Sequence, residues 1–163
     1  MKNNPYNVED LQKFIDIHNI DATILPLSEK TPTVSDAARV LAVEPDQIIK
    51  SLVFMVGGEP LLVINNGMNR VDRTKMALYF EVGKNRIKFA SPDKALIHTG
   101  YQVGSMPPFG HLNRLQTIVD TRVISHEVVF GGGGEINAMM RIEKAELLKV
   151  TGAEIVDVSQ VNS

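Results

Sequence analysis

The chain has 163 residues, 44% of them hydrophobic and 22% charged, with a formal net charge of −2. This size and composition are those of one globular domain with a substantial core, so we expect residues 1–163 to form a single domain. Because the chain contains no cysteine, disulfides, thiolate metal sites and a cysteine nucleophile are excluded. No apolar stretch resembles a signal peptide or a membrane span, which predicts a cytoplasmic protein without a membrane partner.

Helical and strand patterns alternate in the first half of the chain. Asn7 is a suitable N-cap for a first helix, and Thr33 for a second one. Between them, residues 22–27 have the composition of a short strand. Two apolar runs, residues 48–56 and 61–64, are separated by a Gly-Gly-Glu-Pro turn and predict a β-hairpin.

The second half continues the alternation with shorter elements. We expect helices at residues 72–80, 92–98 and 143–150, and strands at residues 86–89, 117–119, 128–130, 138–142 and 155–158. This irregular order, with a hairpin and without an internal repeat, predicts an α+β fold. In such a fold, a mixed, mainly antiparallel β-sheet or barrel is surrounded by short helices.

Residues 100–110, Gly-Tyr-Gln-Val-Gly-Ser-Met-Pro-Pro-Phe-Gly, combine three glycines with two adjacent prolines. The prolines exclude a regular helix or a central strand, while the glycines allow the backbone to approach another group closely. This Gly/Pro segment is therefore either a stiff wall that presents backbone N–H and C=O groups to a ligand, or a well-packed surface turn.

Lys50 is the one charged residue within the apolar run of residues 48–56. Alternation places it on the face of Leu52 and Phe54, and both faces of the strand are apolar, as in a central strand. An ammonium group buried there would need an anionic or carbonyl partner, which a ligand could supply. The alternative is a lysine at the entrance of the strand, with its stem packed and its ammonium group in water.

Other features have weaker patterns. The four histidines lack metal-ligand spacing, although His111 adjoins the Gly/Pro segment, and no Gly-x-Ser-x-Gly motif of a serine hydrolase occurs. Residues 131–134 are four glycines outside any phosphate-binding motif, which predicts either a hinge beside a pocket or a loose turn. Residues 70–94 carry seven basic and three acidic side chains, and form either a phosphate-attracting face or a solvated surface.

Four of these stretches together resemble a known family. They are Ile-Lys-Ser-Leu-Val-Phe at residues 49–54, Val71-Asp72 followed by Lys75, the Gly/Pro segment, and Thr-Ile-Val-Asp at residues 117–120. In this order and spacing, and over residues 8–158, the chain resembles the YbaK/ProX-type aminoacyl-tRNA deacylases. Their domain is also the editing insertion of bacterial prolyl-tRNA synthetases.

The resemblance implies a trans-editing hydrolase that cleaves the ester joining a wrongly attached amino acid to tRNA. The implied substrate is tRNA of the proline system carrying a small amino acid such as Cys or Ala. Lys50 matches the family lysine that helps to hold the terminal adenosine phosphate or the scissile region. The Gly-x-x-x-Pro loop, which positions the aminoacyl group with backbone atoms, corresponds to Gly104, Ser105, Met106, Pro107 and Pro108.

Weaker substrate contacts follow from the same resemblance, at Ser51, Gly100, Gly110, Asp120 and Asn137. No cofactor and no metal are implied, because water or a group of the substrate can attack the ester. The implied partner is tRNA, with prolyl-tRNA synthetase as a second candidate, and the oligomeric state is left open.

Two departures from the family leave the amino acid undetermined. Members that remove alanine carry a histidine shortly after the late glycine run, where this chain has Asn137 and Met139. Met106 and Pro107 are bulkier than the residues of some relatives, which would narrow the pocket or shift the loop.

Two other functions fit the same residues. A binding module associated with a synthetase would hold aminoacyl-tRNA or a nucleotide without hydrolysis. A small-ester hydrolase without an RNA partner would act independently of salt, whereas an RNA-steered reaction weakens as the salt concentration rises.

Overall fold

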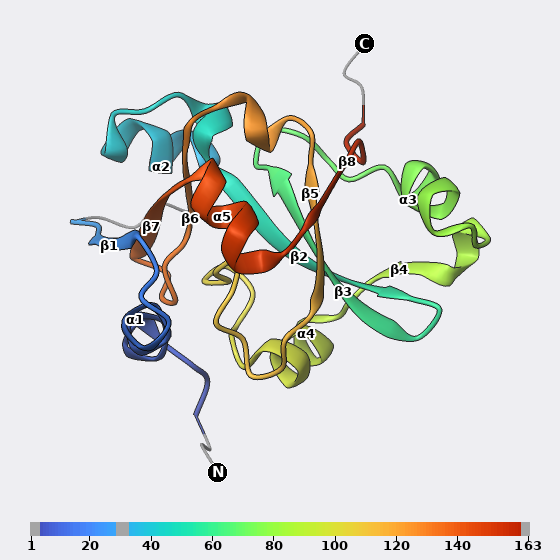
Figure 1. The fold of residues 1–163 in the computed structure, drawn as a ribbon, viewed down its shortest axis with the longest axis horizontal. Helices are drawn as coiled ribbons and strands as arrows, with labels where there is room; N and C mark the ends of the chain where they lie inside the picture. Colours follow the sequence, from blue (N-terminus) through green and yellow to red (C-terminus); the bar gives the residue numbers. More distant parts are fainter. Residues whose placement is uncertain (1–3, 29–32, 161–163) are drawn as a thin grey trace.

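Short helices surround two β-sheets in the computed structural model, which describes residues 4–28 and 33–160 (Figure 1). Within these residues the α-helices are α1 (Val8–Ile17), α2 (Val34–Leu41), α3 (Arg73–Phe80), α4 (Pro92–Thr99) and α5 (Lys144–Thr151). The strands are β1 (Ala22–Pro26), β2 (Ile49–Val56), β3 (Glu59–Asn66), β4 (Ile87–Phe89), β5 (Gln116–Asp120), β6 (Val128–Gly132), β7 (Ala138–Glu143) and β8 (Glu154–Val156). Short 3-10 helices lie at Pro45–Gln47, Lys84–Arg86 and Val123–Ser125.

The larger sheet has the strand order β4-β2-β3-β5-β8. β2 and β3 form the predicted antiparallel hairpin, in which Lys50 lies opposite Asn65, and β4 pairs antiparallel with the far end of β2. The β3–β5 and β5–β8 pairs are parallel. The smaller sheet, β1-β7-β6, is antiparallel throughout. The predicted α+β fold around mixed, mainly antiparallel sheets is confirmed.

The two sheets remain open and do not close into a barrel. A single parallel bridge between Ile48 and Phe130 joins the start of β2 to β6. On the same edge of β2, β4 pairs only with residues 54–56. The middle of β2 therefore has an edge that neither strand covers.

Hydrophobic clusters occupy both faces of the larger sheet. One cluster joins the sheet to α1, β7 and α5, and includes Leu11, Val53, Leu62, Met140 and Leu147. The other lies on the opposite face with α3, and includes Phe54, Leu61, Val63 and Met76. Val53 and Phe54 thus face opposite clusters, which confirms β2 as a strand buried on both faces at this level.

Side-chain caps determine where the helices begin. Asn7 caps α1 in a reciprocal capping box with Asp10, and Thr33 caps α2. Asp72 and Ser91 accept hydrogen bonds from the first turns of α3 and α4. None of the helices in the described part of the chain is long and apolar enough to cross a membrane.

Candidate functional site

A cavity of about 340 Å³ opens where the start of β2 meets α2, β6 and the Gly/Pro segment. Lys50 and Ser51 of β2 line it together with Gly104 and Met106 of the segment. The other walls are mostly apolar and include Val34, Ala37, Val53, Phe89, Val103, Gly132 and Met139. The fold therefore brings together the lysine strand and part of the Gly-x-x-x-Pro loop, which are about 50 residues apart in the sequence.

The cavity follows the uncovered edge of β2. The N–H of Gly67 donates to the carbonyl of Ile48 on the β3 side, whereas the N–H of Ala90 donates to the carbonyl of Val53 on the opposite side. Alternate residues of a strand direct their backbone polar groups to opposite sides. Ser51 therefore directs its N–H and C=O toward the cavity side, as Val53 does, and they can reach a ligand there.

A buried hydroxyl group adds to this polar edge. Ser51 is 9% exposed, and its Oγ is buried without a hydrogen-bond partner in the described part of the chain. Buried hydroxyls are normally hydrogen-bonded, because leaving one unpaired costs free energy. An unpaired hydroxyl in a cavity wall thus indicates a contact for a polar ligand.

Lys50 lies at the mouth of the cavity and is exposed. The expectation of a desolvated ammonium group is wrong, and Lys50 is the strand-entrance lysine of the alternative. The physical reason is that Lys50 projects from the face of β2 that carries Phe54, and the hydrophobic cluster on that face covers Phe54 and part of Leu52 but does not extend to Lys50. Lys50 has no ion pair with any residue that the structure describes, so its charge is available to an anion.

Several hydrogen bonds hold the loop from Gly104 to Pro108. Ser105 donates to the carbonyl of Gln102 through both its N–H (3.2 Å) and its Oγ (2.9 Å). The N–H of Gly134 donates to the carbonyl of Ser105 at 3.0 Å. Gly104 has a φ of +96°, which a glycine adopts without strain. The loop is therefore fixed to the turn that follows β6 and to its own preceding turn.

His111 holds the same loop from the other side. Its Nε2 lies 2.8 Å from the carbonyl oxygen of Pro107 and must carry the proton, because a carbonyl oxygen can only accept. Burial lowers the pKa of His111 from the usual 6.5 to about 4, and the bond to Pro107 opposes this with a smaller upward effect. The ring is therefore neutral at neutral pH.

The four glycines at residues 131–134, predicted as a hinge or a loose turn, lie partly in β6 and partly in the β6–β7 turn. Gly131 and Gly132 belong to β6, and the backbone of Met106 packs directly on Gly132. A Cβ at Gly132 would lie 2.6 Å from the carbonyl carbon of Met106, which is far inside van der Waals contact. Gly131 and Gly132 form a surface on which the loop rests, through Pro108 and Met106.

The remaining predicted site residues lie outside this cavity. Gly100 packs against the ring of Tyr6, and Gly110 against Phe14 of α1. Pro108 faces a second cavity of about 420 Å³ behind the loop. Asn137 is exposed in the β6–β7 turn, where its carbonyl accepts from Leu27.

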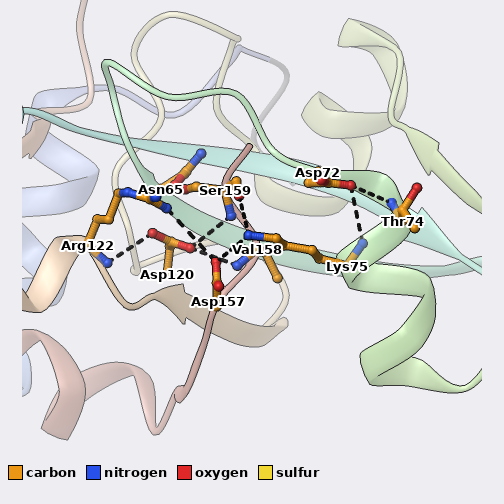
Figure 2. A network of polar contacts seen from close by, with 9 residues as sticks. All are labelled: Asn65, Asp72, Thr74, Lys75, Asp120, Arg122, Asp157, Val158 and Ser159. Atoms are coloured by element: carbon orange, nitrogen blue, oxygen red, sulfur yellow. Dashed lines mark hydrogen bonds and ion pairs between the residues drawn. The ribbon is translucent and has the colours of Figure 1, made fainter. Parts of the chain in front are cut away.

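Asp120 is fully buried in a network that ties the C-terminal segment to the larger sheet (Figure 2). Its carboxylate accepts from the N–H groups of Val158, Ser159 and Arg122 at 2.8–3.0 Å. Ser159 Oγ donates to Asn65 Oδ1 at 2.6 Å, and Asn65 is the β3 residue that lies opposite Lys50. The segment predicted as a strand at residues 155–158 is regular only to Val156, because residues 157–159 turn to bond this carboxylate and its neighbours.

Part of the basic stretch at residues 70–94 has structural roles. Arg73 donates to the carbonyls of Ile87 and Lys84, and Lys75 binds Asp157 and the carbonyl of Ser159. The other basic side chains of the stretch are exposed: Arg70, Lys84, Arg86, Lys88 and Lys94.

Sequence reasoning missed most of the apolar wall residues, among them Val34 and Ala37 of α2 and Phe89 at the end of β4. None of these residues belongs to a motif. Small apolar side chains on one face of a helix, such as those of Val34 and Ala37, usually indicate packing in the core rather than a binding site. Only the high exposure of Phe89, 57%, distinguishes it from a core residue, and exposure is visible only in the structure.

Comparisons with known proteins place the chain in a family. A model of the aminoacyl-tRNA editing domain matches residues 28–150. The chain is 25% identical over 138 residues to the uncharacterized protein YwhH of Bacillus subtilis, covering 84% of this chain and 86% of YwhH. It is 29% identical over 106 residues to the proline–tRNA ligase of Staphylococcus aureus, covering 63% of this chain and only 18% of the ligase.

A solved structure supports the same relationship. The crystal structure of a protein described as a candidate trans-editing enzyme for prolyl-tRNA synthetase superposes with a TM-score of 0.88 at 28% identity. The superposition covers 94% of this chain and 97% of that protein. The match of the family model over most of the chain, together with this shared fold, shows that the chain belongs to the aminoacyl-tRNA editing domain family.

Proposed function

We propose that this protein hydrolyses the ester bond of mischarged aminoacyl-tRNA in trans, on tRNA of the proline system. The observation that carries the proposal is the arrangement around the cavity: an unpaired cation at its mouth, the free backbone edge of Ser51 inside, and a rigid loop opposite. Lys50 meets the phosphate of the terminal adenosine, and the aminoacyl group enters the cavity between Ser51 and Gly104.

Hydrolysis in this site needs positioning and polarisation rather than a protein nucleophile. Water adds to the ester carbonyl carbon, the bond to the ribose oxygen breaks, and that oxygen leaves with a proton. Oriented backbone dipoles stabilise the charge that develops on the carbonyl oxygen, and the loop holds the ester still relative to them. The hydrogen bonds of Ser105 and His111 keep this loop in place before the substrate arrives.

The mostly apolar lining of the cavity, which includes Met106, Val53 and Met139, suits an uncharged amino-acid side chain. Within the proposed function, we expect Cys or Ala to occupy it. The unpaired Oγ of Ser51 offers a hydrogen bond to a polar group of the aminoacyl moiety.

The test compares Lys50→Ala with Lys13→Ala, an exposed lysine on α1. We expect Lys50→Ala to lower kcat/KM on Cys-tRNA and Ala-tRNA of the proline system by about 100-fold or more, since it removes the charge that anchors the substrate. The circular dichroism spectrum should be unchanged, and Lys13→Ala should have wild-type activity. Unchanged deacylation by Lys50→Ala would overturn the proposal. Protection of the ester by the wild-type protein would also overturn it, and would instead indicate a binding module.

A further inference from the structure

Two apolar side chains at the rim of the cavity are largely exposed. Phe89 is 57% and Val103 is 56% exposed, and both line the cavity. Single exposed apolar residues are common on protein surfaces, but two of them at the mouth of one cavity leave an apolar face that no described residue covers.

The exposed ring of Phe89 is nevertheless held in place. Its residue pairs with Phe54 in the β2–β4 ladder, and the next residue, Ala90, donates to the carbonyl of Val53 at 2.9 Å. The two phenyl rings meet edge to face, with centroids 5.2 Å apart and an interplanar angle of 80°. Because Phe54 is only 3% exposed, the Phe89 ring rests on a fixed support and loses little freedom when a ligand stacks on it.

Phe89 and Lys50 bracket the mouth of the cavity. Phe89 lies beside residue 54 of β2, four residues along the strand from Lys50, which corresponds to about 13 Å. The Lys50 side chain can extend into this interval. A cation at one end and an aromatic ring at the other suit the phosphate and the base of a single nucleotide.

We propose that Phe89 and Val103 form a stacking platform for the adenine base of the 3′-terminal nucleotide of tRNA. The inference rests on the proposed function, because it places the aminoacyl group in the cavity beside Ser51. The ester and the base are attached to the same ribose, so the base must lie within a nucleoside's length of the ester, at the rim. Bases stack readily on exposed aromatic side chains in single-stranded nucleic acid sites.

The experiment measures binding without hydrolysis. Its probe is the alanyl amide of 3′-amino-3′-deoxyadenosine, and its reference is the same amide on a ribose that carries hydrogen in place of adenine. Phe89→Ala should weaken binding of the adenosine probe about 10-fold and leave the base-free probe unaffected. Phe89→Trp should restore binding, and Leu78→Ala, which removes a 75% exposed side chain from α3, should have no effect.

Three outcomes would overturn the platform: no binding of the adenosine probe to the wild-type protein, equal affinity of the wild-type protein for both probes, or an equal loss of affinity for both probes in Phe89→Ala.

The failure of the platform and the failure of the proposed function give different results. Base-dependent binding without ester hydrolysis would contradict the proposed function and support the platform. Hydrolysis of aminoacyl-tRNA with the same kcat/KM in wild type and Phe89→Ala would support the function and contradict the platform.

Discussion

Charge at the cavity is concentrated in a single side chain. Among the described residues that line the cavity, Lys50 alone is charged, and the walls around it are mostly apolar. An ion pair in water contributes little, but the low-dielectric walls make the field of this ammonium group stronger on the cavity side than on the solvent side. The mouth therefore attracts an anion while the interior remains suited to an uncharged aminoacyl ester.

His111 links the loop to the pH dependence of stability. The pKa of this buried imidazole is lowered to about 4, so the folded protein binds its proton more weakly than the unfolded chain does. Between pH 6.5 and 4 the unfolded state therefore takes up more protons, and the free energy of unfolding falls as the pH falls. Above pH 6.5 the ring is neutral in both states, and this contribution is constant.

We expect His111→Gln to flatten the pH dependence of stability between pH 6.5 and 4. The wild-type slope from this group is at most about 1.4 kcal/mol per pH unit, and glutamine, which can still donate to Pro107, does not titrate. Urea unfolding at a series of pH values measures the difference. His18→Gln, at the exposed C-cap of α1, is the control and should retain the wild-type slope. An unchanged slope in His111→Gln would show that the ring is not buried in its neutral form.

At the scale of elements, the site depends on which part of β2 has no paired strand. β4 stops at Phe89, and the pairing with β6 is a single bridge at Ile48, so the middle of β2 has no paired strand on one side. The Gly/Pro segment lies opposite this edge of β2 but does not pair with it, because Pro107 and Pro108 lack the N–H groups that a β-ladder needs. The space between the segment and β2 is the cavity.

We expect Gly132→Ala to displace the loop. The new methyl group would meet the backbone of Met106, with its carbonyl carbon at 2.6 Å, and a backbone cannot rotate away as a side chain can. Such overpacking typically costs about 1–3 kcal/mol, and a loop moved by an ångström should lower kcat/KM at least about 10-fold. Thermal unfolding and single-turnover deacylation measure the two effects.

Gly83→Ala is the matched control for this substitution. Its φ is −67°, and the nearest atom to an added Cβ is the flexible end of the Asn85 side chain. It should have nearly wild-type stability and activity. Equal activity of Gly132→Ala and Gly83→Ala would contradict the role of β6 as the support of the loop.

The sequence predicts the elements better than their tertiary relations. The hairpin, the Asn7 and Thr33 caps and the α+β class follow from local patterns, which act within a few residues. The exposure of Lys50 does not, because it depends on how far along β2 the cluster with Met76 and Ile118, both distant in the sequence, extends. The role of the glycines in β6 cannot be predicted from local patterns either. Glycine is needed at residue 132 because the backbone of Met106, distant in the sequence, packs against it. The loop was identifiable by its composition, whereas Phe89 was not.

At the scale of the whole molecule, the cavity lies at the junction of two sheets, and the C-terminal segment reinforces the larger one. Figure 2 shows this segment beside β3 and β5, with Asp120 at the centre of its contacts. Three backbone N–H groups, from two distant parts of the chain, depend on this one carboxylate. The bond from Ser159 to Asn65 extends the same network to the strand opposite Lys50.

We therefore expect Asp120→Ala to destabilise the protein as a whole rather than to change its chemistry. The substitution leaves buried N–H groups without an acceptor, at a cost of about 3 kcal/mol, which lowers Tm by roughly 10 °C in a chain of this size. Asp157→Ala is the control, because Asp157 has 57% of its side chain exposed and pairs with Lys75 at the surface. The Asp157→Ala substitution should lower Tm by at most about 2 °C.

Well below the melting transition, kcat/KM of Asp120→Ala should remain within about threefold of wild type, since Asp120 does not line the cavity. A large loss of kcat/KM in a fully folded Asp120→Ala protein would instead place Asp120 in contact with the substrate.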